Sequence, residues 1–275
     1  MHTRSIPSSG EALPVIGLGT YRGFDVTAGS PKHAQLPGVL GALFSAGGSV
    51  IDSSPMYGRA EATAGALLDE PARARAFIAT KVWTRGRDAG IAQMQRSMDL
   101  LHTPRIDLMQ VHNLLDWKIH LATLRASKDA GRIRYLGVTH YTSSAYPELE
   151  AVLRAEPLDF VQLNYSVADR AAEARLLPLA AERGVAVLVN LPLGSGAVLR
   201  SVQRAALPPF AAELECTSWA QLLLKYVIAH PAVTCAIPGT GRPEHMADNA
   251  RAGVGPIPDE QMRGRILQSW NDARG

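Results

Sequence analysis

The stretch "IDSSPMYGRAE" (residues 51–61) starts like a buried strand and changes character within a few residues. Ile51 belongs to the apolar run inside "SVIDSS" (residues 49–54), and the carboxylic acid of Asp52 follows it at once. The phenol of Tyr57 comes next, in a segment whose proline and glycine favour a turn. A carboxylate and a phenol therefore stand where a strand ends and the chain turns toward a helix.

Short apolar runs of this kind recur along the chain, and longer amphipathic stretches separate them. Most of the runs are continuous and not alternating, which is typical of parallel strands covered on both faces. We predict eight strands, at residues 15–20, 49–54, 76–83, 105–112, 134–140, 159–165, 185–193 and 233–239.

The stretches between these runs have helical spacing. Residues 90–102 place Ile91, Met94, Met98 and Leu101 at helical intervals, while the stretches 121–131 and 173–184 end on glycines typical of a helix end. The strand-to-strand period of about thirty residues is close to one βαβ unit. Eight such units predict an α/β fold, a (β/α)8 TIM barrel, and an open doubly wound sheet is the alternative.

Two segments fall outside this alternation. Residues 4–17 contain the turn "SSGE" between two short extended pieces and predict a β-hairpin ahead of the first barrel strand. Residues 194–217 form the longest interval, and we expect a functional loop there. No linker, low-complexity segment or internal repeat is visible, so residues 1–275 are expected to form a single barrel domain.

The composition excludes several classes of protein. With 47% hydrophobic and 19% charged residues the chain can bury a large core, and a net charge of +3 without a Lys/Arg run argues against nucleic acid. The two cysteines make neither a disulfide framework nor a metal site. No apolar stretch is long enough for a bilayer, and the N-terminus lacks a signal-peptide pattern. We therefore expect a cytoplasmic protein that binds neither metal, membrane nor nucleic acid.

Four polar residues stand at the ends of neighbouring predicted strands. Asp52 ends the second strand and Tyr57 follows it, while Lys81 and His112 stand near the ends of the third and fourth. In a (β/α)8 barrel the chemistry lies at the carboxyl ends of the strands, so these groups are expected to converge. Each has a simpler explanation alone: a helix cap for Asp52, a rim aromatic for Tyr57, a core residue for His112.

The chemistry of the four groups suits carbonyl reduction. The pKa of a free tyrosine is about 10, and a nearby ammonium is expected to lower it. Asp52 would keep Lys81 charged, and His112 would orient the substrate oxygen or the phenol. Tyr57 then becomes a general acid that protonates the oxygen while hydride reaches the carbon.

At these residues the sequence resembles the aldo-keto reductase superfamily, and the resemblance covers nearly the whole chain. The matching motifs are "GLGT" (17–20), "IDSSPMYGRAE" (51–61), "ATKVW" (79–83), "IDLMQVHN" (106–113), "GRIRYLGVTHY" (131–141), "DFVQLNYS" (159–166) and "IPGTGRPEHMADN" (237–249). The resemblance implies an NADPH-dependent enzyme that reduces aldehydes or ketones. It also implies a catalytic set of Asp52, Tyr57, Lys81 and His112.

The resemblance implies that NADPH lies across the barrel mouth. The tight loop before a helix start near Pro243 is itself a candidate phosphate site, because helix N-termini attract anions. In the family, separate residues contact the 2′-phosphate, the nicotinamide carboxamide and the pyrophosphate of the cofactor. The resemblance assigns the pyrophosphate to residues 194–196 of this chain. The expected cofactor contacts are Gly19, Thr20, Asp52, Thr139, His140, Gln162, Asn190, Leu191, Leu193, Gly194, Gly196, Pro238, Gly239, Thr240, Arg242, His245 and Asn249.

The sequence departs from the family pattern at several of these contacts. The pair Thr139 and His140 stands where many members have Ser-Asn. Gly239 stands where many members have a basic residue, and His245 where many have Arg or Gln. Asn190 stands where many members stack a tyrosine on the nicotinamide. These departures bear on the preference for NADPH over NADH and on the nicotinamide environment.

Aromatic residues follow several of the predicted strands. On loops they are typical of a pocket wall, and we expect Tyr21, Phe24, Trp83 and Trp117 to contact a small-molecule carbonyl substrate. Two rival functions are a regulatory sensor that binds NADPH with slow turnover and a Schiff-base lyase that uses Lys81. Neither the particular aldehyde or ketone nor an oligomeric state follows from these residues.

Overall fold

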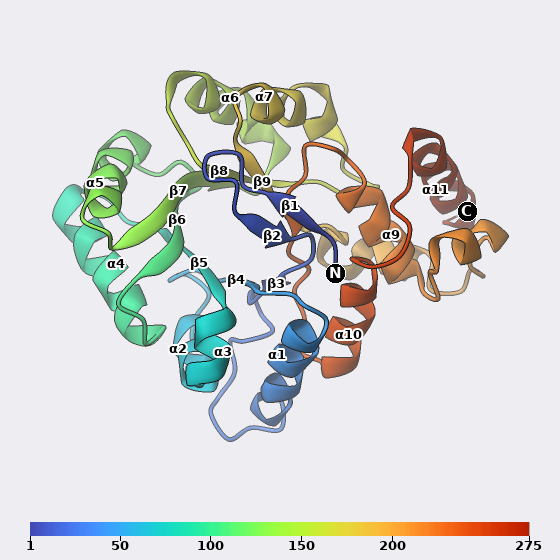
Figure 1. The fold of residues 1–275 in the computed structure, drawn as a ribbon, viewed down its shortest axis with the longest axis horizontal. Helices are drawn as coiled ribbons and strands as arrows, with labels where there is room; N and C mark the ends of the chain where they lie inside the picture. Colours follow the sequence, from blue (N-terminus) through green and yellow to red (C-terminus); the bar gives the residue numbers. More distant parts are fainter. Residues whose placement is uncertain (275) are drawn as a thin grey trace.

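The computed structural model describes residues 1–274 and places eight parallel strands in one sheet that curls into a barrel (Figure 1). Neighbouring strands follow the order of the sequence, so each crossover adds the next strand along the ring. The predicted (β/α)8 barrel is confirmed. The barrel strands are β3 (Leu18–Gly19), β4 (Val50–Asp52), β5 (Phe77–Val82), β6 (Ile106–His112), β7 (Ile133–His140), β8 (Phe160–Asn164), β9 (Ala186–Asn190) and β10 (Cys235–Ala236).

The barrel closes between its first and last strands through single parallel bridges. Ile16 pairs with Ala236, and Gly19 pairs with Gly239. The backbones of the first and last strands come so close here that a Cβ atom on Gly19 would lie 2.9 Å from the carbonyl oxygen of Ile237. Since the contact is limited to these bridges, β3 and β10 are shorter than the runs 15–20 and 233–239 predicted.

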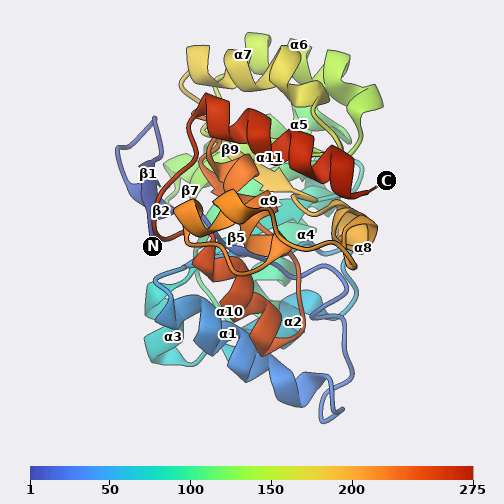
Figure 2. The ribbon, with the colours of Figure 1, turned by 90° about the vertical axis from the view of Figure 1, so that its right-hand side faces the viewer.

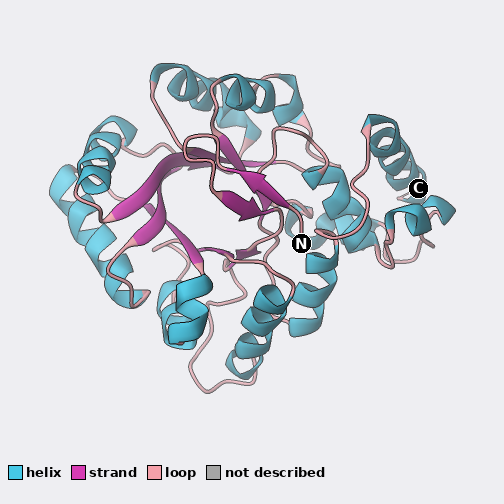
Figure 3. Ribbon diagram, in the orientation of Figure 1, coloured by secondary structure: helices cyan, strands magenta, loops and turns pink. Residues whose placement is uncertain are grey.

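Helices surround the strands on the outside of the barrel (Figure 3). Two of the predicted helix ends have the expected geometry, because Gly131 and Gly184 follow the helices at Trp117–Asp129 and Leu176–Glu182 with φ of 72° and 64°. The helices are α1 (Leu36–Ser45), α2 (Ala60–Leu67), α3 (Glu70–Arg75), α4 (Arg87–Leu100), α5 (Trp117–Asp129), α6 (Tyr146–Ala155), α7 (Leu176–Glu182), α8 (Ala197–Ser201), α9 (Trp219–Ile228), α10 (Pro243–Arg251) and α11 (Glu260–Ala273).

Short 3₁₀ turns complete the connections, namely η1 (His33–Gln35), η2 (Ser143–Ala145), η3 (Ala171–Ala174), η4 (Gly194–Gly196) and η5 (Pro209–Leu214). The interval of residues 194–217, expected to be a loop, is instead occupied in large part by η4, α8 and η5. Apolar residues such as Val198, Phe210 and Leu214 are buried there and hold the turns on the core. No helix in residues 1–274 is long and apolar enough to cross a membrane.

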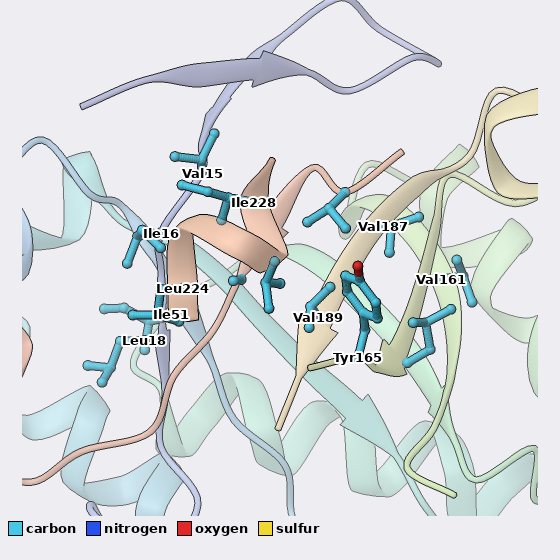
Figure 4. Close-up of a cluster of buried hydrophobic side chains, with 14 of the residues drawn as sticks. Val15, Ile16, Leu18, Ile51, Val161, Tyr165, Val187, Val189, Leu224 and Ile228 are labelled. Carbon is cyan, nitrogen blue, oxygen red and sulfur yellow. The ribbon is translucent and has the colours of Figure 1, made fainter. Parts of the chain in front are cut away.

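The core has two parts. The larger part lies between the sheet and the surrounding helices, where strand residues such as Val187 and Val189 lie near α9 residues such as Leu224 and Ile228 (Figure 4). The smaller part fills the barrel interior with side chains such as Phe77, Leu108 and Phe160. This inner cluster forms an apolar floor below the polar strand ends.

The predicted hairpin is present as β1 (Thr3–Ser5) and β2 (Ala12–Pro14), and it covers the amino-terminal end of the barrel. Ile6 and Leu13 from the hairpin are fully buried in the inner cluster. The hydroxyl of Tyr135 on β7 donates to Ser9 Oγ at 2.8 Å, which holds the hairpin turn. Figure 2 shows the hairpin and α8 at opposite ends of the barrel.

The hairpin is also tied to the far side of the barrel. The guanidinium of Arg4 donates to the carbonyl oxygens of Ile228 and His230, at 2.7 and 2.6 Å. These carbonyls lie at the end of α9, where helix carbonyls lack partners within the helix. The hairpin therefore bridges β7 on one side and the segment before β10 on the other.

Candidate active site

Three neighbouring strands bring polar side chains to one rim of the barrel. Asp52 is the last residue of β4, Lys81 the last but one of β5, and His112 the last of β6. Because the strands are parallel and adjacent, their carboxyl ends meet at the same edge. Tyr57 joins them from the turn after β4, which Gly58 closes with φ of 60°.

A buried ion pair lies at the centre of this rim. Lys81 Nζ donates to Asp52 Oδ2 at 2.6 Å and to the carbonyl oxygen of Ser53 at 2.7 Å. The side chain of Lys81 is fully buried and that of Asp52 nearly so. Burial alone would lower the pKa of Lys81, but Asp52 and Tyr57 together, through charge and hydrogen bonding, outweigh it, and the pKa lies above its usual value. Lys81 is therefore an ammonium at neutral pH.

The other oxygen of Asp52 is held by two amides. Gln162 Nε2 donates to Asp52 Oδ1 at 2.9 Å, and Gln110 Nε2 donates to the same atom at 3.2 Å. Thr139 Oγ1 in turn donates to Gln162 Oε1 at 3.2 Å. We call these five residues, Asp52, Lys81, Gln110, Thr139 and Gln162, the polar layer. It lies directly on the apolar floor of the barrel.

Tyr57 lies over this layer, and its ring is bordered by Tyr21, Lys81 and His112. Lys81 Nζ lies 5.1 Å from the centre of the Tyr57 ring, and the Tyr21 and His112 ring centres lie 5.0 and 6.2 Å from it. Burial raises the pKa of Tyr57 above its usual value, although the charge of Lys81 lowers it in part. The expected net lowering is therefore wrong here, because desolvation and the charge of Asp52 outweigh the ammonium.

His112 is a buried, neutral imidazole. Its Nδ1 lies 3.4 Å from Ser54 Oγ, and its ring lies 6.3 Å from that of Trp83. Burial lowers the pKa of His112 to about 3, and the charge of Lys81 adds to this effect. At neutral pH the ring therefore has one donor and one acceptor nitrogen, which suits a hydrogen bond to an uncharged oxygen.

A cavity of about 1250 Å³ opens above these groups and runs across the barrel mouth to the start of α10. Most of the expected contacts line it: Gly19, Asp52, Tyr57, His112, Gln162, Asn190, Leu191, Leu193, Gly196, Pro238, Gly239, Thr240, Arg242, His245 and Asn249, with Tyr21 and Trp83 on the expected substrate wall. This volume exceeds that of an ordinary small-ligand pocket and leaves room for a dinucleotide beside a substrate.

The structure places the other expected contacts away from the cavity walls. Thr20 and Thr139 are buried behind them, and Thr20 Oγ1 donates to Asp52 O at 3.0 Å. His140 accepts from the Thr142 backbone N–H through Nδ1 at 3.2 Å, and Gly194 also lies off the walls. The ammonium of Lys81 is covered by the residues above it.

Two expected substrate contacts lie elsewhere. Phe24 is fully buried in the core, because the loop after β3 folds back and its N–H donates to the Thr20 carbonyl at 3.0 Å. Trp117 begins α5 and packs partly buried against the core. Met56 and Tyr141 are exposed apolar side chains that line the cavity instead, beside Tyr21 and Trp83.

The far end of the cavity suits an anion, although its charges are mixed. The N-terminus of α10 faces it, and Thr240 Oγ1 accepts from the Arg242 N–H at 3.1 Å. The guanidinium of Arg242 pairs with Glu244, whose carboxylate also lines the cavity. Both side chains are more than half exposed, so the pair is weak and a phosphate can displace it.

Sequence reasoning missed two polar residues at this end, Lys32 and Gln35. They lie three residues apart in the helical turn before α1, and Gly38 follows at the same interval. Gly38 packs so closely on Pro243 that a Cβ would lie 2.8 Å from that ring. The spacing was visible in the sequence, but the packing of α1 against α10 was not.

The cavity also fits the nicotinamide end of a dinucleotide. Asn190 Oδ1 and Asn113 Oδ1 are buried acceptors without a partner in residues 1–274, and both residues line the cavity near the polar layer. A carboxamide nitrogen is a donor that can satisfy such an acceptor. Between the two ends, Gly19 and Gly239 line the cavity with backbone alone.

The chain is similar in sequence to known reductases. The model of the aldo/keto reductase family matches residues 15–266. The aldo-keto reductase YhdN of Bacillus subtilis (strain 168) is 28% identical over 206 residues, which cover 69% of this chain and 61% of that protein. An aldo-keto reductase of Mycobacterium sp. (strain JLS) is also 28% identical, over 70% of this chain and 68% of that protein. The alignment thus spans less than two thirds of the Bacillus protein.

Solved structures match over nearly the whole chain. An aldo/keto reductase from Klebsiella pneumoniae in complex with NADP and acetate has a TM-score of 0.83 at 26% identity, covering 98% of this chain and 96% of that one. The thermostable aldo-keto reductase Tm1743 in complex with the inhibitor epalrestat has a TM-score of 0.79 at 26% identity, covering 98% and 100%.

Proposed function

Because this chain belongs to the aldo/keto reductase family, we propose that it reduces a small aldehyde or ketone to an alcohol with NADPH. The observation that supports this most directly is the cluster of Tyr57, Lys81, His112 and Asp52 beneath a cavity large enough for dinucleotide and substrate. NADPH, when bound, supplies the hydride that reaches the carbonyl carbon. The chain's own residues position the carbonyl and deliver the proton.

Tyr57 is the proton donor in this proposal. Its phenol is protonated at neutral pH because burial raises its pKa, so the acid form is fully populated. The O–H bond of Tyr57 breaks as the substrate oxygen gains the proton and becomes the alcohol hydroxyl. The ammonium of Lys81 stabilises the phenolate that remains, since the two lie close together in a site shielded from water.

His112 positions the carbonyl, and Asp52 keeps Lys81 charged. A neutral imidazole can donate one hydrogen bond to the carbonyl oxygen without competing for the proton. Asp52 is fixed by three donors and does not itself reach a substrate as a base.

The cofactor would lie along the cavity with its adenine end at α10. The chain offers Thr240 and Arg242, and also Lys32, to the 2′-phosphate, and Gln162 with Asn190 to the carboxamide. The NADP complex of the Klebsiella pneumoniae relative supports a nicotinamide cofactor for this fold. The preference for NADPH over NADH then depends on Arg242, because a guanidinium can hold a phosphate with two hydrogen bonds.

The experiment is an NADPH-oxidation screen across small aldehydes with the Tyr57→Phe variant. We expect the rate of reduction to fall about 10²- to 10⁴-fold, the usual contribution of a general acid, while NADPH binding stays nearly unchanged. Tyr135→Phe, which removes a hydroxyl at the barrel floor, serves as the control for loss of a phenol. Full turnover by Tyr57→Phe would show that another group donates the proton.

The environment of Lys81 disfavours the Schiff-base alternative. A nucleophilic amine must lose its proton and reach the substrate, whereas Lys81 is fully buried with its pKa raised and two of its protons committed. Borohydride treatment with a carbonyl substrate is expected to leave the chain unlabelled. The sensor alternative keeps one supporting observation, the asparagine at position 190, and single-turnover oxidation of bound NADPH separates it from a reductase.

A further inference from the structure

Gln110 contacts the active site from behind, where no ligand can reach it. It lies on β6, two residues before His112, and its Cα is paired with that of Lys81 in the β5–β6 ladder. The residue is fully buried and does not line the cavity. The one hydrogen bond of its side chain within residues 1–274 is from Nε2 to Asp52 Oδ1 at 3.2 Å.

The orientation of the Gln110 amide follows from charge. If the amide were turned over, Oε1 would face the carboxylate of Asp52, and two acceptors would repel each other. In the observed orientation the amide donates to Asp52, and Oε1 is left buried without a partner. A buried unpaired acceptor is unfavourable, and a leucine or methionine would avoid it. Packing alone therefore does not account for a glutamine here.

The two amides that donate to Asp52 Oδ1, those of Gln110 and Gln162, differ in their surroundings. Gln162 lines the cavity and is shared with Thr139, so a bound ligand can compete for it. Gln110 has neither a second partner nor access to the cavity. When a ligand draws on Gln162, Gln110 is the amide that stays on Asp52 Oδ1.

We propose that Gln110 is a positioning residue, which holds the Asp52 carboxylate directed at Lys81 and so keeps the ammonium in place beneath the Tyr57 ring. The inference rests on the proposed role of Tyr57 as proton donor. Gln110 acts through Asp52 and Lys81 and touches neither substrate nor cofactor.

Two substitutions test the donor itself. Gln110→Met keeps the length of the side chain and removes the donor, so the Asp52 charge is less compensated and the Tyr57 phenolate is harder to form. We expect kcat to fall about tenfold, the effect of one hydrogen bond to a charged group, with the Kd of NADPH unchanged. Gln110→Glu can donate only while protonated, so its activity should fall toward alkaline pH well before that of the wild type.

Thr80→Val is the matched control. Thr80 lies beside Lys81 on β5 but points outward, and its hydroxyl donates to the buried carboxylate of Glu61 at 2.6 Å. Like Gln110→Met, the Thr80→Val variant therefore loses one buried hydrogen bond to a carboxylate and a comparable part of the unfolding free energy. It leaves the polar layer intact. A purely structural role for Gln110 predicts that both variants behave alike.

A titration that needs no substrate separates this inference from the proposed function. Tyrosines are replaced by 3-fluorotyrosine, the Tyr57 signal is assigned by its loss in Tyr57→Phe, and its pKa is followed by ¹⁹F NMR. The expected result is a higher Tyr57 pKa in Gln110→Met and no change in Thr80→Val. An unchanged Tyr57 pKa in folded Gln110→Met would overturn the inference, even if the wild type is a reductase.

The remaining outcomes are also decisive. If the wild type reduces no carbonyl, the proposed function fails, while the titration still decides the role of Gln110. If Gln110→Met does not fold, Gln110→Glu replaces it, and a Tyr57 pKa and pH–rate profile like those of the wild type would refute the role. A changed Kd for NADPH with an unchanged kcat would place Gln110 in cofactor binding instead.

Discussion

Removing Lys81 should destabilise the fold far more than removing both members of its ion pair. In Lys81→Met the carboxylate of Asp52 stays buried, only 2% exposed, and keeps only the two glutamine amides as partners. Breaking a buried pair at one side costs about 3–5 kcal/mol, because an uncompensated charge remains. That is a large share of a total stability of about 5–15 kcal/mol.

The double variant Asp52→Asn/Lys81→Met tests the cause. It has no buried charge, so we expect it to be more stable than Lys81→Met by about 2–3 kcal/mol, because replacing both partners of a buried pair is often close to neutral. Urea unfolding of the wild type, both single variants and the double variant measures the coupling.

The result that refutes this reasoning is additivity. If the two single losses sum to that of the double variant, the charges of Asp52 and Lys81 do not depend on each other. A Lys81→Met variant within about 1 kcal/mol of the wild type would likewise show that water reaches Asp52, since exposed pairs contribute no more than that.

Three further results are expected. Gly65→Ala should lose about 1–3 kcal/mol of unfolding free energy, because its Cβ would lie 2.0 Å from the Leu100 carbonyl oxygen, whereas Gly264→Ala, with open space in helix α11, should gain up to about 1 kcal/mol. The pKa of His112 falls from 6.5 to about 3 on folding, so its neutral form stabilises the fold above the unfolded value. That contribution is lost as the pH falls below 6.5 toward 3, and urea unfolding of His112→Asn should therefore approach that of the wild type at acid pH. Arg242→Ala should raise the Kd of NADPH about tenfold and leave that of NADH nearly unchanged, as measured by fluorescence titration.

The inner strands could be predicted from the sequence because their apolar runs are continuous. β6 and β7 were predicted within about a residue or two, the usual uncertainty of element ends. The ends of β3 and β10 could not be predicted, because they depend on where these two strands meet to close the barrel. That contact requires the close backbone approach at Gly19, which is a tertiary feature.

The candidate site divides in the same way. Asp52 and His112 were identified because a polar residue at the end of an apolar strand is a local feature of the chain. The direction of the Tyr57 pKa could not be predicted, since it is the balance of burial against two charges. Phe24 faces the core and Lys32 the cavity because of how loops and helices pack, which residue types alone do not reveal.

The β1–β2 hairpin over the amino-terminal end of the barrel takes its place late in folding. Arg4 binds carbonyls at residues 228–233, so the hairpin takes its final place only after the chain has been made as far as residue 233. Contacts between such distant residues form late, because the long connecting chain must be ordered first. Until then the inner cluster of the barrel is not covered by the hairpin. A nascent chain that stalls before residue 228 would therefore expose these apolar side chains to chaperones.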